Sequence, residues 1–227
     1  NKDSILSPKL SFMYSPNNTK DYTATKRRID INNIYSSNRI AIDDTVEGGE
    51  SLTLGTEYQL IDKKGNDLVA IDLGAVLRKN KNKHLPKSAK IGENLSDIVG
   101  NLKIKPSKSF DLNYDFSMDN SLDRFNFNFL ELGLNVNNFV TSFEFLEENN
   151  EIGTESYFSS KLGYKFDNNN SINFATRRNR KTNLTEFYNL MYQYENDCLI
   201  AAIEYNKDYY SDTDLSPGEE IFFSLTI

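Results

Sequence analysis

Residues 110–118 read Phe-Asp-Leu-Asn-Tyr-Asp-Phe-Ser-Met, and their alternation is the clearest structural signal in the chain. All five even-numbered positions carry apolar or aromatic residues, and all four odd-numbered positions carry polar ones. A helix would scatter these side chains around its circumference, whereas a strand sorts them onto two opposite faces. The stretch therefore predicts a β-strand with one apolar face and one polar face.

The same alternation recurs along most of the chain and predicts about twelve strands, the first near residues 5–14 and the last near 220–227. The weakest prediction is at 171–180, where few residues are apolar. Most connections are short and rich in Asn, Asp and Gly, which tolerate the left-handed conformations that tight hairpins require. No helical pattern separates the strands. We therefore expect an all-β, antiparallel up-and-down sheet, not an α/β fold.

The composition excludes several classes of protein. The chain has 227 residues, a formal net charge of −7 and 38% hydrophobic residues. No apolar run approaches the roughly 20 residues of a membrane-spanning helix, but a membrane β-barrel stays possible because its strands alternate. The acidic balance argues against a nonspecific nucleic-acid partner. With one cysteine, Cys198, and one histidine, His84 in a lysine-rich run, a Cys/His zinc site is excluded. We expect no enzyme activity, no catalytic residue and no cofactor.

Two all-β architectures fit this pattern: a transmembrane barrel, or a soluble β-sandwich or lipocalin-like barrel with its apolar face inside. The predicted strands run about 10–12 residues, above the usual length in soluble proteins of about 5–6 and close to the 9–11 that cross a membrane. Three long connections, near 15–49, 78–97 and 208–218, fall on one side of the sheet when strands are counted back from the C-terminus. Outer-membrane barrels show this asymmetry, so we favour the transmembrane barrel.

Several stretches resemble the C-terminal barrel region of the LPS-assembly outer-membrane protein family LptD (also called OstA or Imp). They are residues 6–16, 38–49, 95–119 and the segment from 197 to the last strand. Residues 38–49 resemble the family motif NRFxGxDRxEGG, in which Ile40, Ile42 and Thr45 replace the expected Phe, Gly and Arg. The matching positions of this motif loop are Asn38, Arg39, Asp44, Glu47, Gly48 and Gly49.

The resemblance implies that residues 1–227 form the C-terminal half of an outer-membrane barrel, with the periplasmic N-terminal domain outside this chain. It also implies a translocon that inserts lipopolysaccharide (LPS) into the outer leaflet of the Gram-negative outer membrane. The implied partners are LPS, an LptE-like lipoprotein plug and an LptA-like periplasmic bridge protein. A porin-like passive channel or small-solute transporter stays open as an alternative. An outer-membrane hydrolase is disfavoured, because His84 is the only histidine.

The resemblance assigns roles to two further places. The last strand would form one lip of a lateral gate, with gate candidates Ile221, Phe222, Phe223, Ser224 and Leu225. The family ties its barrel to its periplasmic domain by disulfides from a cysteine pair near position 198. Because Leu199 follows Cys198 here, at most one such bridge could form, to a cysteine outside this chain.

Charged clusters give a further hypothesis. Arginine pairs with phosphate in a bidentate manner, so a basic cluster near the predicted extracellular rim could contact LPS phosphates. Its residues are Arg177, Arg178, Arg180 and Lys181. A solvated loop end is the competing interpretation. The acidic residues Asp43, Asp44 and Glu47 lack the regular spacing of a calcium loop, so we predict no metal site.

Overall fold

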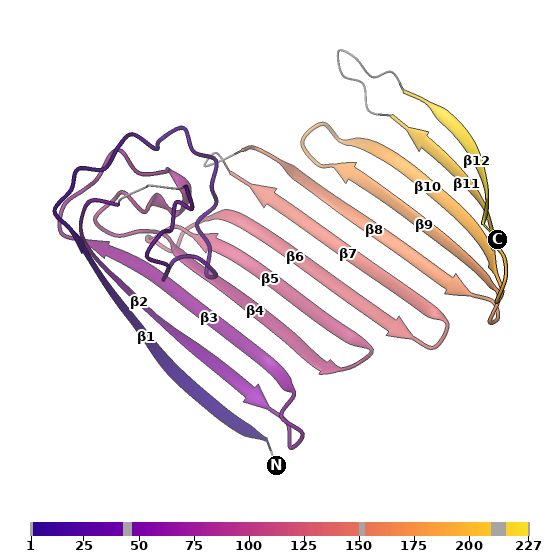
Figure 1. The fold of residues 1–227 in the computed structure, drawn as a ribbon, viewed down its shortest axis with the longest axis horizontal. Coiled ribbons are helices and arrows are strands. Elements are labelled where there is room, and N and C mark those ends of the chain that lie inside the picture. The colour runs from indigo at the N-terminus through magenta and orange to yellow at the C-terminus, as the bar shows by residue number, and fades with distance from the viewer. Residues whose placement is uncertain (1, 43–46, 150–152, 210–216, 227) are drawn as a thin grey trace. The chain divides into compact units, whose positions relative to one another are not determined.

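The computed structural model describes residues 2–42, 47–149, 153–209 and 217–226. Its twelve strands form one antiparallel sheet in the order of the sequence, from β1 to β12 (Figure 1). This confirms the predicted all-β, up-and-down meander and the number of strands. The strands are β1 (Asp3–Ser15), β2 (Gly49–Ile61), β3 (Asp67–Arg78), β4 (Ile98–Ser107), β5 (Phe110–Met118), β6 (Phe125–Val136), β7 (Phe139–Glu148), β8 (Ser156–Lys165), β9 (Asn170–Asn179), β10 (Leu184–Glu195), β11 (Ile200–Asp208) and β12 (Glu219–Thr226).

The sheet is not closed: in the described strands β1 and β12 are the two edges. In an antiparallel meander the connections that follow odd-numbered strands all lie at the same end of the strands. The three long connections follow β1, β3 and β11, so they lie at one end of the strands, as predicted. The one described helix, the 3₁₀ turn η1 (Ser88–Lys90), lies in the second of them. No helix in the described ranges is long and apolar enough to cross a membrane.

The chain divides into two compact units, which we describe separately. The first comprises residues 1–106, 112–129 and 147–154, and includes β1 to β3. Their register places Leu10 opposite Leu54 and Leu54 opposite Ala75 on one face. Leu10 is 71% exposed, so this apolar face is not covered. On the opposite face, Lys9 pairs with Glu57 at 3.0 Å and with Asp72 at 2.5 Å.

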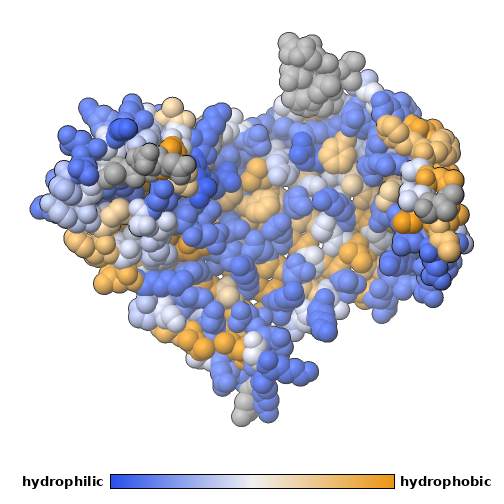
Figure 2. Space-filling view, viewed as in Figure 1, coloured by the Kyte–Doolittle hydropathy of each residue, from blue (hydrophilic) through white to orange (hydrophobic). Residues whose placement is uncertain are grey.

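The second unit comprises residues 107–111, 130–146 and 155–227. An apolar row crosses five of its strands, from β8 to β12, in the order Leu162, Phe174, Leu190, Tyr205 and Ile221. The opposite face of the same strands is polar. There the Asn189 amide donates to the Glu204 carboxylate at 2.5 Å. Figure 2 shows that hydrophilic side chains predominate on the side of the sheet drawn there.

In the soluble alternative the apolar face would form the interior, but the described connections leave this face uncovered. Nine of the eleven buried apolar residues in the described ranges gather where the first two long connections pack on the polar face of β3 and β4. This core consists of Ile29, Ile31, Ile34, Ile40, Leu85, Ala89 and Ile91 from the connections, with Val76 and Val99 from the strands. In Figure 1 these connections gather at one end of the strands of the first unit. In the first unit the connections thus cover the polar face and leave the apolar face uncovered, which is the arrangement expected of strands in a membrane barrel.

Candidate functional site

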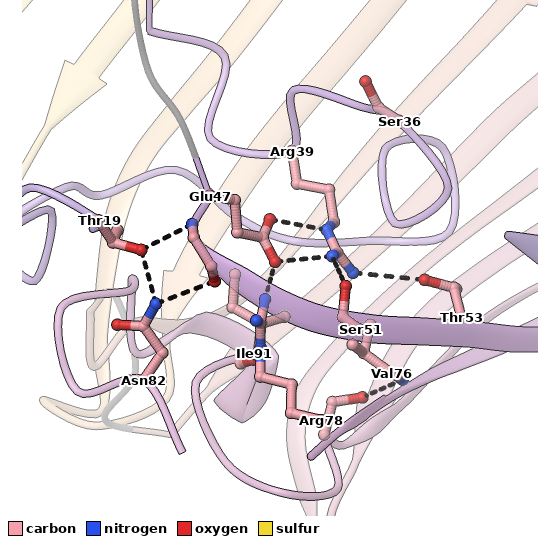
Figure 3. Close-up of polar contacts among 12 residues, drawn as sticks. Thr19, Ser36, Arg39, Glu47, Ser51, Thr53, Val76, Arg78, Asn82 and Ile91 are labelled. Carbon is pink, nitrogen blue, oxygen red and sulfur yellow. Dashed lines mark hydrogen bonds and ion pairs between the residues drawn. The ribbon is translucent and has the colours of Figure 1, made fainter. Parts of the chain in front are cut away.

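A buried ion pair anchors the first long connection, and both of its residues belong to the motif loop (Figure 3). The Arg39 side chain is fully buried. Its Nε and Nη2 atoms donate to the two carboxylate oxygens of Glu47, at 3.0 and 2.6 Å. The remaining donors reach β2, where Nη2 lies 2.9 Å from the Ser51 hydroxyl and Nη1 lies 3.4 Å from the Thr53 hydroxyl. Bidentate arginine–carboxylate pairs of this kind are geometrically specific as well as strong.

A second arginine completes the cluster. Arg78, the last residue of β3, forms an ion pair with the same Glu47 carboxylate and donates from Nε to the Ile91 carbonyl at 2.5 Å. One carboxylate therefore serves two guanidinium groups. Burial lowers the pKa of Arg39 to about 10, and because this value still lies well above 7 the group stays charged at neutral pH. The cluster ties the first and second long connections to the β2–β3 hairpin.

The turn before Glu47 is closed by an asparagine side chain. The Oδ1 atom of Asn38 accepts from the Ala41 amide at 2.8 Å, and its Nδ2 donates to the Ile42 carbonyl at 3.2 Å. The left-handed conformation of this turn lies at Ala41, with φ of 54°. Ile42 therefore occupies the position of the motif glycine without needing positive φ. Asp43, Asp44 and Thr45 lie outside the described residues.

Glycine is needed at the two glycine positions of the motif for different structural reasons. A Cβ atom on Gly48 would lie 2.1 Å from the Asn17 carbonyl, so a side chain has no room there. The Gly48 amide donates to the Thr19 hydroxyl at 2.8 Å, and the Asn82 amide donates to the same hydroxyl at 2.6 Å. Gly49 begins β2 with φ of 91°, a conformation that favours glycine. The pair lets the chain pass closely under Asn17 and then turn into the sheet.

A second anchor, which sequence reasoning missed, is built on two glycines that face each other. Gly55 of β2 pairs with Gly74 of β3, and the Tyr35 side chain lies against both. The Tyr35 hydroxyl donates to the Leu73 carbonyl at 2.9 Å. Facing glycines leave a notch in the sheet surface that an aromatic ring can enter. The sequence offers only two isolated glycines in strand patterns, a known sign of close approach by another group.

The predicted phosphate-contact cluster lies at the β9–β10 turn, at the end of the strands that carries the long connections. Its residues already have partners within the protein. The Nε of Arg177 in β9 donates to the Glu186 carboxylate, and its guanidinium lies 5.2 Å from the Tyr157 ring centroid. Arg178 donates to the Asn183 side chain. Arg180 donates to the Ser156 hydroxyl at 3.2 Å. Lys181, in the following turn, donates from its backbone amide to Asn179. A phosphate would have to compete with these contacts.

The predicted gate strand and the cysteine occupy exposed positions. All eight residues of β12 are exposed, and among the large apolar residues that the structure describes Phe223 is the most exposed, at 77%. Ile221, Phe223 and Leu225 continue the apolar face, whereas Phe222 and Ser224 alternate onto the polar face. Cys198 is exposed in the short turn between β10 and β11, at the end of the strands opposite to the long connections. It lines a depression of about 710 Å³ together with Glu195 and Thr226.

A comparison with protein-family models matches residues 3–221 to LptD: LPS transport system D. The chain belongs to the LptD family. This confirms the resemblance and assigns the chain to a family of outer-membrane proteins that serve LPS transport to the outer membrane. A search of the curated proteins gave no match.

In this LptD-family chain the motif loop anchors the first two long connections to the sheet. The structure brings Asn38, Arg39, Glu47, Gly48 and Gly49 together, whereas it places Cys198, β12 and the Arg177 cluster elsewhere. Every donor atom of the Arg39 guanidinium contacts the protein, so this group offers no open position to a ligand. The described residues hold no group of three or more potential metal ligands.

Proposed function

We propose that the chain is part of the translocon that inserts LPS into the outer leaflet of the Gram-negative outer membrane. The observation that carries this proposal is the family match over residues 3–221. The exposed apolar face of the twelve-stranded sheet supports it, because such a face is stable only against lipid or another apolar surface.

The sheet is proposed to be the C-terminal half of a larger barrel, with residues 1–227 supplying twelve of its strands. The edges β1 and β12 each present a row of backbone groups without a strand partner in the described chain. Such edges are costly in lipid, since the hydrocarbon offers no hydrogen bonds. Further strands would complete the barrel, and a periplasmic domain would deliver LPS to it.

The strand β12 is proposed as one lip of a lateral gate. It pairs only with β11, and its residues are exposed. Its side chains alternate between the two faces of the sheet, with Phe222 and Ser224 on the polar side and Phe223 on the apolar side. A glycolipid that leaves the lumen between two strands must pass between these two environments.

The proposed partners are LPS, an LptE-like lipoprotein plug and an LptA-like bridge protein in the periplasm. The long connections would face the cell exterior and the short turns the periplasm, as in outer-membrane barrels. The Arg177 cluster would then lie near the LPS phosphates, where bidentate contacts are favourable. Its present contacts with Glu186 and Asn183 would be exchanged for phosphate oxygens.

Depletion of the full-length protein in its host tests the function. We expect LPS to disappear from the cell surface and to accumulate at the inner membrane, with recovery when the wild-type gene is restored. The measurement is the fraction of LPS modified by an enzyme confined to the outer leaflet. Unchanged surface LPS together with slower uptake of small solutes would instead identify a passive channel.

The Cys198 thiol is expected to be bridged to a cysteine outside this chain. The turn that carries it would face the periplasm, which is an oxidising compartment. In the full-length protein, a maleimide reagent should therefore label Cys198 only after reduction. A Cys198→Ser variant shows how much of the signal comes from this residue. Equal labelling with and without reductant would refute the bridge.

A further inference from the structure

The lysine-rich second connection, residues 79–97, forms one wall of a cavity within the first unit. The cavity has a volume of about 900 Å³ and also contacts the β5–β6 turn and the residue after β7. Small-molecule sites occupy about 300–1,000 Å³, so the cavity is large enough for a sugar-sized ligand or a disaccharide. Leu85 and Pro86 are buried and form an apolar part of its wall.

The lining of the cavity is strongly basic. It contains Lys81, Lys83, Lys87, Lys90 and Arg124, against one carboxylate, that of Glu93. Three of these cations are already paired within the protein. Lys81 lies 2.5 Å from Glu93, while Lys90 and Arg124 share the Asp119 carboxylate.

Two lysines are left to meet a ligand. The hydrogen bond from Lys90, with those from Ser121, holds the pKa of Asp119 well below its usual range, so this carboxylate stays charged and paired at neutral pH. Lys83 and Lys87 are exposed, and neither has an ion-pair partner in the part of the chain that the structure describes. Two ammonium groups without an ion-pair partner among the described residues, both lining one cavity, favour an anion there.

The asparagines of the lining add hydrogen-bond acceptors. The side-chain amide nitrogens of Asn94, Asn120 and Asn149 each donate to a backbone carbonyl, at 3.2, 3.0 and 3.1 Å. Their Oδ1 atoms accept no hydrogen bond from the described residues. Carbonyl oxygens that are fixed in place in this way suit the hydroxyl groups of a saccharide, which need acceptors.

We propose that this cavity binds a phosphate-bearing saccharide, with Lys83 and Lys87 contacting phosphate and the asparagine amides contacting hydroxyl groups. The site is separate from β12 and from the Arg177 cluster. Its assignment to a headgroup at the cell surface rests on the proposed function, whereas the binding chemistry does not. A free sugar phosphate offers the same groups, and the experiment distinguishes the two sources.

Calorimetric titration of the full-length protein in detergent, at low ionic strength, tests the site. The probes are a deacylated glucosamine disaccharide with two phosphates, the same disaccharide without phosphate, glucose 6-phosphate and inorganic phosphate. We expect saturable binding of the bisphosphate, at least tenfold tighter than of the phosphate-free sugar or of inorganic phosphate. The affinity should fall as salt is added, because exposed charges are screened. Equal affinity for glucose 6-phosphate would support the same chemistry with a free sugar phosphate as the ligand.

A double variant, Lys83→Gln with Lys87→Gln, is expected to weaken bisphosphate binding at least tenfold. The matched control is Lys63→Gln with Lys64→Gln, which makes the same charge change in the exposed β2–β3 turn at the opposite end of the strands. The control should bind as wild type does. No saturable binding by wild type, or equal loss in both double variants, would overturn the proposal. Binding is measured without transport, so a failed depletion experiment would leave this result standing.

Discussion

Replacing Glu47 with alanine is expected to lower the free energy of unfolding by about 3–5 kcal/mol, the range for breaking a buried ion pair. The substitution leaves two buried guanidinium groups, those of Arg39 and Arg78, without their carboxylate. A charge in such a place has neither water nor a counterion. The measurement is urea unfolding of the protein in detergent, followed by circular dichroism.

A surface ion pair provides the matched control. Glu93 pairs with Lys81, and both side chains are about half exposed, so Glu93→Ala should cost less than about 1 kcal/mol. Glu47→Gln should fall between the two, because the amide oxygen retains one acceptor. Since the cluster holds the first long connection, a protease should also cleave within residues 17–42 sooner in Glu47→Ala. Equal unfolding curves for Glu47→Ala and Glu93→Ala would show that the buried cluster contributes no more than a surface pair.

The Gly55→Ala substitution is expected to destabilise the protein by about 2–3 kcal/mol, as overpacking does. The added Cβ would lie 1.8 Å from the Tyr35 hydroxyl and 2.1 Å from the Leu73 carbonyl. The tyrosine can move away, but the carbonyl belongs to the paired strand β3. We therefore expect both weaker pairing of the β2–β3 hairpin and release of Tyr35 from its notch. Urea unfolding and proteolysis of the first connection measure these two effects.

Two variants separate these causes. In Gly218→Ala nothing lies within 4 Å of the added Cβ, so the stability should stay within about 0.5 kcal/mol of wild type. Adding Tyr35→Phe to Gly55→Ala removes the hydroxyl contact but not the carbonyl contact, and should restore only part of the lost stability. If Gly55→Ala is as stable as Gly218→Ala, the close packing of Tyr35 on the sheet is refuted.

The strand prediction at 171–180 shows where sequence reasoning was sufficient despite a weak signal. Few apolar residues mark it, yet β9 forms over Asn170–Asn179. Its Phe174 lies opposite Leu162 on one side and Leu190 on the other, so two neighbouring strands fix its register. A strand in the middle of a sheet needs only a few matching residues, because a one-residue slip would move all of them to the wrong face.

The candidate site was only partly predictable. Asn38, Arg39, Glu47, Gly48 and Gly49 were selected through the motif. Their physical role, and the participation of Arg78, came from the structure. Nothing in the pattern around Arg78 distinguishes it from other charged residues at strand ends. The sequence likewise shows the lysine-rich run around His84, but the cavity that this run lines came from the structure.

The sequence by itself determined the strands, their polar and apolar faces, and the end of the strands at which each connection lies. These follow from the period of two, which is local, and from counting strands in an antiparallel meander. Tertiary structure alone decided what the connections do. The β2–β3 register places Arg78 opposite Ser51, next to Arg39, and places Gly55 opposite Gly74, where Tyr35 enters. Both sites combine residues that are distant in the sequence, such as Tyr35 and Leu73, which are 38 positions apart, and no local pattern brings such residues together.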